Sequence, residues 1–309
     1  MSIIEFNVLT KQDKPLLDRY FRSRRYENSH FNFTNLFMWR QPYHIQWCEE
    51  DGVLYMTCEW DGELMAMQPF GPQEKMQEAT GRLIHYFEEQ GRPLVLTGLE
   101  RSYAEVLEKY PVASFAVESD RDNFDYVYLA ENLIHLSGRK LHSKKNHLNA
   151  FRKLYPQAEY LPIAEDILPA CREELARWYE IRIQDEPDDP FIDWERRAIL
   201  ELFEDYTYFQ LRGSAIRLDG RIIAFTFGEQ LNDDTVVVHV EKADPSIRGA
   251  YPAINQGYVE SCWSGMTYIN REEDMGHEGL RKAKESYKPE RMIEKFNARL
   301  LGSESRSVE

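Results

Sequence analysis

The chain has 309 residues, of which 42% are hydrophobic and 13% are aromatic. This composition supports a sizeable core, excludes an intrinsically disordered protein, and at this length predicts about two domains. Acidic residues outnumber basic ones 53 to 38, which gives a formal net charge of −15. Because such a surface repels phosphate backbones, the charge excludes a general DNA-binding protein and restricts any nucleic-acid contact to a local basic patch.

The four cysteines, Cys48, Cys58, Cys171 and Cys262, form no CxxC pair and have no histidine cluster beside them at metal-ligand spacing. This pattern predicts reduced cysteines in a cytoplasmic protein without a metal site. No apolar run approaches the ~20 residues of a membrane span, so no transmembrane segment is expected. The first residues lack the pattern of a signal peptide, and residues 301–309 are expected to form a disordered tail.

The first predicted domain, residues 1–138, alternates helices and strands. Apolar spacing predicts helices over 11–24, 75–89 and 101–109, whereas short apolar runs predict strands over 44–48, 53–60, 63–70, 93–99 and 124–129. The dipeptides Asp51-Gly52 and Asp61-Gly62 are typical of hairpin turns.

The second predicted domain, residues 157–300, repeats this order. Strands are expected over 158–163, 209–218, 221–231, 235–243, 266–270 and 291–300, with helices over 166–184, 194–205, from 251, and over 279–287. The proline-containing stretch 185–190 is expected to end the first of these helices. The fold class is therefore α/β (α+β), with two similar halves that indicate duplication at the level of the fold.

A basic linking helix is predicted between the halves, over residues 139–156. No acidic residue occurs from Asn132 to Ala158, where six Lys and Arg residues stand. Ser143 is the expected N-cap, and Leu141, Leu148, Phe151 and Leu154 are expected to face inward. The basic residues either form a solvated helix face or create a seat for a phosphate-bearing ligand or a tRNA stem. The candidate patch consists of Arg139, Lys140, Lys144 and Lys145.

A strand-loop-helix junction runs from the strand at 235–243 through Asp244-Pro245 into a helix near Tyr251. Backbone N–H groups at a helix N-terminus favour an anion, Gly249 permits close backbone approach, and Arg248 adds a cation. The junction therefore predicts a pyrophosphate cradle. The residues assigned to it are Ile247, Arg248, Gly249, Ala250 and Tyr251.

This junction resembles the Pro-x-x-Arg-Gly-x-Gly loop of the GNAT acyltransferases. Pro245, Arg248 and Gly249 match the pattern, whereas Tyr251 stands in place of the second glycine. The resemblance implies an acyl-CoA donor bound at this loop. It also implies that Tyr287, in a stretch similar to the Ala-x-x-x-Tyr of the family, protonates the departing thiolate; the alternative is that Tyr287 only packs the end of its helix.

A closer resemblance covers nearly the whole chain. The runs DNFDYVYLAENLIHLSGRKLHSKKNHLNAF, HVEKADPSIRGAYPAIN and YINREEDMGHEGLRKAKESYKP are similar to the family named for the C-terminal domain of phosphatidylglycerol lysyltransferases. This resemblance implies a stand-alone pair of tandem GNAT-like domains, each with a mixed, mostly antiparallel sheet flanked by helices. Lysyltransferases of this kind move an aminoacyl group from tRNA to a lipid head group.

Transfer from either acyl-CoA or aminoacyl-tRNA requires a base, a hydrogen-bond donor to the oxyanion and an acid for the leaving group. Glu241, near the end of the strand that leads into the loop, is the candidate base, and Glu229 is the alternative carboxylate. By strand alternation His239 is expected to share the face of Glu241, as a proton relay or a core histidine, whereas Lys242 points to the opposite face. The remaining candidates for donor binding are Val240, Lys242, Asn270 and Lys284. For Asn270 the alternative is a helix-entry cap, and for Lys284 it is a solvated helix face.

Electrostatics favours an acyl-CoA donor, because CoA needs only a few N–H groups and cations whereas tRNA recruits many Lys and Arg residues. The predicted function is acyl transfer from acyl-CoA to an amine of a small molecule or peptide. The alternatives are aminoacyl-tRNA-dependent transfer to a lipid or peptide, with tRNA on the linking helix, and a non-catalytic ligand-binding protein. Two fused halves that satisfy each other's sheet edges allow a monomer.

Overall fold

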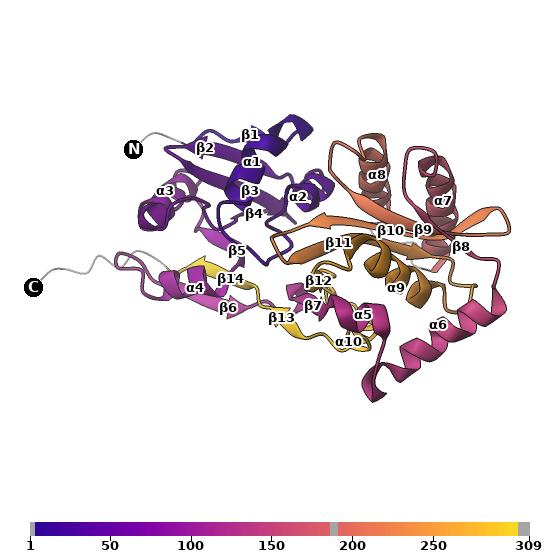
Figure 1. Ribbon diagram of the computed structural model, residues 1–309. Helices are drawn as coiled ribbons and strands as arrows, with labels where there is room; N and C mark the ends of the chain where they lie inside the picture. Colours follow the sequence, from indigo (N-terminus) through magenta and orange to yellow (C-terminus); the bar gives the residue numbers. More distant parts are fainter. Residues whose placement is uncertain (1–3, 186–190, 302–309) are drawn as a thin grey trace, which may run out of the picture. The chain divides into compact units, whose positions relative to one another are not determined.

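The structure is a computed structural model that describes residues 4–185 and 191–301. The chain divides into two compact units (Figure 1). The first consists of the residues up to Phe124 together with those from Ile293 onward, and the second of Asp125–Met292. Within the described ranges, no helix is both long enough and apolar enough to cross a membrane.

The first unit is built on a seven-stranded sheet in the order β1-β2-β3-β4-β5-β14-β6. Its strands are β1 (Asn7–Val8), β2 (Gln46–Glu50), β3 (Val53–Trp60), β4 (Glu63–Ala66), β5 (Val95–Leu99), β6 (Phe115–Ser119) and β14 (Phe296–Leu300). Its helices are α1 (Lys14–Phe21), α2 (Phe33–Trp39), α3 (Met76–Glu89) and α4 (Arg101–Glu108). β4 and β5 are parallel, and the other neighbours are antiparallel.

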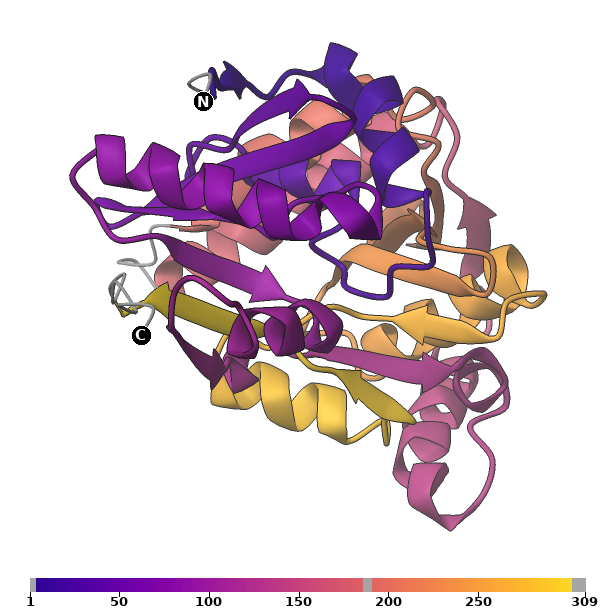
Figure 2. The ribbon, with the colours of Figure 1, turned by 90° about the vertical axis from the view of Figure 1, so that its left-hand side faces the viewer.

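Local sequence explains much of this unit. Asp51-Gly52 and Asp61-Gly62 have positive φ values throughout, as two-residue hairpin turns require. The apolar face of α3 packs on the sheet, where it covers one side (Figure 2). The short helix α2 was not predicted: nearly all of its side chains are buried, so it shows no amphipathic period.

The second unit contains a seven-stranded sheet in the order β13-β7-β12-β11-β10-β9-β8. Its strands are β7 (Asp125–Leu129), β8 (Glu159–Pro162), β9 (Arg212–Leu218), β10 (Arg221–Gln230), β11 (Thr235–Ala243), β12 (Tyr268–Asn270) and β13 (Arg291–Ile293). Its helices are α5 (Ala130–His135), α6 (His142–Leu154), α7 (Leu168–Asp185), α8 (Phe191–Glu204), α9 (Ala250–Trp263) and α10 (Glu278–Glu285). β11 and β12 are parallel, whereas β8 to β11 form an antiparallel series.

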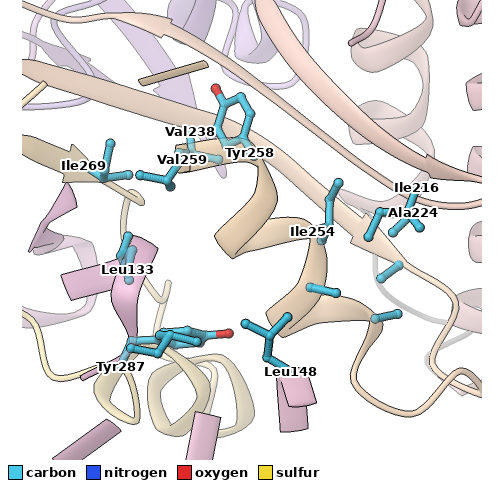
Figure 3. Close-up of a cluster of buried hydrophobic side chains, with 14 of the residues drawn as sticks. Leu133, Leu148, Ile216, Ala224, Val238, Ile254, Tyr258, Val259, Ile269 and Tyr287 are labelled. Carbon is cyan, nitrogen blue, oxygen red and sulfur yellow. The ribbon is translucent and has the colours of Figure 1, made fainter. Parts of the chain in front are cut away.

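Helices cover both faces of this second sheet, with α9 on one side and α7 and α8 on the other (Figure 1). On the α9 face, Ile254, Tyr258 and Val259 pack against strand residues such as Val238 (Figure 3). On the opposite face, the ring of Phe203 in α8 packs against Phe225 and Phe227 of β10. Two mixed, mostly antiparallel sheets flanked by helices confirm the predicted fold class.

The compact units differ from the predicted domains because two segments belong to the other unit. The single strand predicted over 291–300 is two strands, because the chain leaves β13 at Ile293 and joins the first sheet as β14 from Phe296. Residues 125–138, predicted in the N-terminal domain, supply β7 and α5 of the second unit. The predicted breaker 185–190 lies outside the described residues except for the end of α7, and so does the predicted tail except for Leu301.

The basic helix predicted over residues 139–156 exists as α6, but it lies within the second unit instead of linking two domains, and its start also differs from the prediction. The N-cap is Leu141 without a side-chain hydrogen bond, so Ser143 lies one residue inside the helix and does not cap it. Leu141, Leu148 and Phe151 are buried as expected. Leu154, the last residue of α6, is 53% exposed instead, because the helix has already left the core there.

Candidate functional site

The candidate site lies where β11 and β12 separate. Their parallel pairing ends at Val237 and Asn270, yet β11 continues to Ala243. Beyond this point the edge of β11 has no partner strand on that side among the described residues. Polar side chains from both strands gather at the opening.

A bulge in β11 decides which face each of these side chains occupies. Val238 pairs with Gly228 and Val240 pairs with Phe227, so His239 is an extra residue in the ladder. The extra residue reverses the alternation, because both residues at a bulge turn to one side. The expectation that His239 shares the face of Glu241 is therefore wrong.

On the α9 face, Glu241 holds two partners. Asn255 Nδ2 in α9 donates to Glu241 Oε2 at 2.9 Å, and Arg271 Nη2, just after β12, donates to Glu241 Oε1 at 2.9 Å. The ion pair spans the opening between the two strands, with side chains only 11% and 12% exposed. Glu241 therefore lies at the site, with both oxygens occupied.

Aromatic rings and a lysine complete the cluster on this face. The Arg271 guanidinium lies 5.7 Å from the ring centre of Tyr128 and 4.9 Å from that of Tyr287. Lys144 Nζ, from the first turn of α6, lies 4.2 Å from the ring centre of Tyr287. Burial and then the charge of Arg271 lower the pKa of Lys144. We call Lys144, Glu241, Asn255, Arg271 and Tyr287 the Arg271 cluster.

Tyr287 is buried and lies two residues after the last residue of α10. Figure 3 shows its ring near Leu133, with the hydroxyl directed to the side of Leu148 in α6. Burial raises the pKa of Tyr287 above its usual value, so the phenol stays protonated at neutral pH. In the described part of the chain its hydroxyl has no hydrogen-bond partner, which leaves a proton donor available in the cluster.

The opposite face carries a buried histidine between two carboxylates. His239 Nδ1 lies 3.0 Å from Glu272 Oε1, and His239 Nε2 lies 3.2 Å from Glu229 Oε1. Burial favours the neutral ring, but hydrogen bonds with both carboxylates outweigh it and raise the pKa of His239 to about 9. The pair His239–Glu272 also spans the opening, so consecutive residues Arg271 and Glu272 bridge β12 to β11 on its two faces.

The predicted pyrophosphate loop is packed against α6. Gly249 is the N-cap of α9 at φ +84°, and a Cβ there would lie 2.6 Å from His147 O and 3.0 Å from Phe151 Cβ. The close approach that this glycine permits is thus to α6. Arg248 is exposed, and Tyr251 accepts a hydrogen bond from Trp178 Nε1 in α7 at 3.1 Å.

The other predicted donor-binding residues are engaged within the protein. Lys242 Nζ contacts both oxygens of Glu195 at 2.9 and 2.8 Å on the α8 face, away from Glu241 as expected. Asn270 donates to Asp125 Oδ2 at 2.9 Å and accepts from the Glu272 amide at 2.8 Å. It does not cap the entry of a helix, because α10 begins at Glu278 and has His277 as its N-cap. Val240 and Ala250 are buried, and Ile247 packs beside the α9 core.

Lys284 is buried rather than placed on a solvated face. Its Nζ donates to Arg271 O at 2.6 Å and to Glu273 O, so it fixes the backbone that carries Arg271. Burial lowers its pKa to about 8. Of the basic patch, Arg139, Lys140 and Lys145 are exposed, whereas Lys144 alone reaches the Arg271 cluster.

Sequence reasoning did not assign roles to Arg271, Asn255 or Glu272. For Arg271 and Glu272, the sequence signal was the polar run at 270–272, which directly follows a buried strand. Asn255 and Gln256 are two buried amide side chains in the mostly apolar first half of α9. Among the described residues, no group of three or more His, Cys, Asp or Glu side chains is arranged to hold a metal ion.

Comparisons with known proteins agree with this architecture. The uncharacterized protein MYCGA3080 of Mycoplasmoides gallisepticum is 28% identical over 209 residues, which is 67% of this chain and 64% of that protein. The chain therefore spans less than two thirds of this relative. A conserved protein of unknown function from Bacteroides thetaiotaomicron is 34% identical, with a TM-score of 0.89 over 96% of this chain and 100% of that one.

The family described as phosphatidylglycerol lysyltransferase, C-terminal, matches residues 21–299. The chain belongs to this family. The structure of L-PGS from Bacillus licheniformis has a fold similar to that of this chain, with a TM-score of 0.63 at 13% identity over 93% of this chain and 91% of that one. A tandem GNAT protein from the clavulanic acid biosynthesis pathway aligns at a TM-score of 0.50 and 10% identity, over 97% of this chain and 99% of that one. The fold is tandem GNAT-like.

Proposed function

We propose that this chain transfers an aminoacyl group from an aminoacyl-tRNA to a hydroxyl or amine acceptor. The observation that carries the proposal is the double bridge across the opening between β11 and β12. Arg271 pairs with Glu241 on one face, and Glu272 pairs with His239 on the other. In the GNAT acyltransferases, which this chain resembles, these two strands splay apart to admit the pantetheine arm of the donor. A CoA donor bound in that way, which the sequence favoured, would compete with both pairs for the opening.

The loop before α9 supports the same choice of donor. A pyrophosphate cradle needs backbone N–H groups that face an open space. Here Gly249 packs against the carbonyl of His147, and the side chain of Tyr251 is held by Trp178. Arg248 remains an exposed cation, but it lacks the open glycine loop that would accompany it in a CoA site.

Family membership supports aminoacyl transfer as well, because the family description names a lysyltransferase that acts on phosphatidylglycerol. The identity of the acceptor is also part of this proposal. The family description supports a lipid hydroxyl as the acceptor, and a soluble amine is the second candidate.

The Arg271 cluster fits the steps of ester aminolysis or transesterification. The acceptor atom bonds to the ester carbonyl carbon, its proton passes to solvent, and the bond from that carbon to the ribose oxygen breaks. Tyr287 is the group suited to protonate the departing ribose oxygen, because its buried phenol keeps its proton and has no other partner in the described part. Glu241, with both oxygens already occupied, orients Arg271 and Asn255 rather than acting as the base.

The test is a transfer assay with two donors, tRNA charged with a labelled amino acid and labelled acetyl-CoA, each with phosphatidylglycerol vesicles and with an amine mixture. We expect label to move from tRNA only, and Tyr287→Phe to slow this transfer by about 10²-fold, the lower end of the contribution of a general acid. Tyr155→Phe, which removes a hydroxyl from the end of α6, is the matched control and should retain the rate. Transfer from acetyl-CoA without transfer from tRNA would refute the proposal.

A further inference from the structure

Positive charge is in surplus around Tyr287. Lys144 Nζ and the Arg271 guanidinium both lie against its ring, at 4.2 and 4.9 Å from the centre. The carboxylate at this position, Glu241, is bound directly by Arg271. Lys144 has neither an ion pair nor a hydrogen bond within residues 4–185 and 191–301, although it is only partly exposed.

Two buried polar atoms of the same cluster also lack partners. Arg271 Nη1 is a donor and Asn255 Oδ1 is an acceptor, and neither forms a hydrogen bond in the described structure. Asn255 is only 1% exposed. An unpaired buried polar group is costly, so these atoms point to a ligand that supplies one acceptor and one donor. Both residues also donate a hydrogen bond to Glu241, so the two unpaired atoms belong to side chains of the same cluster.

We propose that Lys144, Arg271 and Asn255 bind a phosphodiester that carries a free hydroxyl group close to its phosphate. Lys144 and Arg271 supply charge-assisted hydrogen bonds to the phosphate oxygens. Asn255 Nδ2 is committed to Glu241, so its Oδ1 accepts from the hydroxyl. A simple carboxylate would neutralise the cations but leave Asn255 Oδ1 unpaired.

Two sources share this chemistry. The head group of phosphatidylglycerol and the 3′-terminal nucleotide of tRNA each place a hydroxyl a few bonds from a phosphodiester. The choice of these two molecules rests on the proposed function. The phosphodiester site itself is argued from the positive charge of Lys144 and Arg271 and from the unpaired atoms of Arg271 and Asn255. It specifies which part of a substrate the Arg271 cluster recognises.

The experiment measures equilibrium binding to the full chain by calorimetry at low ionic strength. The probes are glycerophosphoglycerol, the trinucleotide CpCpA, and dimethyl phosphate, which has no hydroxyl. The variant is Lys144→Gln, which removes a partly exposed charge without opening the core. Lys153→Gln removes an equal charge from the other end of α6 and is the matched control.

We expect glycerophosphoglycerol or CpCpA to bind saturably and more tightly than dimethyl phosphate. Lys144→Gln should weaken that binding at least fivefold, whereas Lys153→Gln should change it less than twofold. Tighter binding of glycerophosphoglycerol assigns the site to a lipid head group, and tighter binding of CpCpA assigns it to the tRNA end. Equal effects of the two variants, or no binding of either hydroxyl-bearing probe, would overturn the inference.

The outcome is separable from that of the proposed function. If binding depends on Lys144 but no label leaves charged tRNA, the phosphodiester site stands and aminoacyl transfer fails. If transfer proceeds and Lys144→Gln alters neither transfer nor binding, aminoacyl transfer stands and the phosphodiester site is refuted.

Discussion

His239 and Glu241, separated by one residue in β11, lie on opposite faces of the second sheet. Regular alternation would place them together, but the bulge opposite Phe227 and Gly228 shifts the register between them. His239 therefore meets Glu272 on one face while Glu241 meets Arg271 on the other. The bulge thus allows two consecutive residues after β12 to bridge to β11 on both sides.

The histidine bridge predicts a specific dependence of stability on pH. The folded-state pKa of His239 rises from 6.5 to about 9, so its stabilisation is complete below pH 6.5 and is lost as the pH rises to about 9. At about 1.4 kcal/mol per pKa unit, this amounts to a loss on the order of 3 kcal/mol. Denaturant unfolding of wild type and His239→Gln at pH 6 and pH 9.5 measures it.

The wild-type advantage over His239→Gln should shrink between those two pH values. His85→Gln, at a half-exposed histidine on α3, is the control and should show no such difference. A constant gap between wild type and His239→Gln would show that the pKa of His239 is the same in the folded and unfolded protein.

The contact between Gly249 and α6 predicts a large effect of one methyl group. In Gly249→Ala, the new Cβ would lie 2.6 Å from His147 O at φ +84°. Gly138→Ala has nearly the same φ, +82°, but nothing within 4 Å of its Cβ. Both variants suffer the left-handed backbone, so the free energy of unfolding should fall further for Gly249→Ala, by about 1–3 kcal/mol of overpacking. If both variants lose the same free energy of unfolding, α6 can move away from residue 249 at no cost, and the predicted close packing is wrong.

The ion pair between Glu241 and Arg271 predicts that removing the charge of Glu241, without changing the shape of its side chain, lowers the stability of the protein. Glu241→Gln leaves a nearly buried guanidinium without its counter-charge, which should lower the free energy of unfolding by about 3 kcal/mol. Glu278→Gln, which breaks an exposed pair with Lys282, should cost less than about 0.5 kcal/mol. Urea unfolding of both variants gives the comparison, and a loss for Glu241→Gln as small as that of the control would contradict the assigned bridge.

Much of the fold could be predicted from local sequence. The strands β9, β10 and β11 follow from their apolar composition, and Asp219-Gly220 forms the turn expected between the first two, with positive φ at both residues. The helix after Gly249 begins within one residue of its predicted start. These elements are set by short-range patterns, namely strand composition, turn residues and a helix start.

The site could be predicted only in part, because long-range contacts build it. Glu241 and Tyr287 were singled out and do lie in one cluster, but Arg271 joins them from 30 positions after Glu241. The bulge at His239 leaves no trace in a run of buried residues. The packing of Gly249 on His147 likewise depends on where α6 docks, which no local pattern specifies.

Whether the donor is aminoacyl-tRNA or acyl-CoA is tested by a calorimetric titration of the wild-type chain with acetyl-CoA, beside one with aminoacyl-tRNA. Aminoacyl transfer from tRNA predicts saturable binding of the charged tRNA, and the bridges on both faces of the β11–β12 opening predict no saturable binding of acetyl-CoA up to millimolar concentration. Tight binding of acetyl-CoA, lost in Arg248→Ala, would contradict the account and return the donor site to the loop before α9.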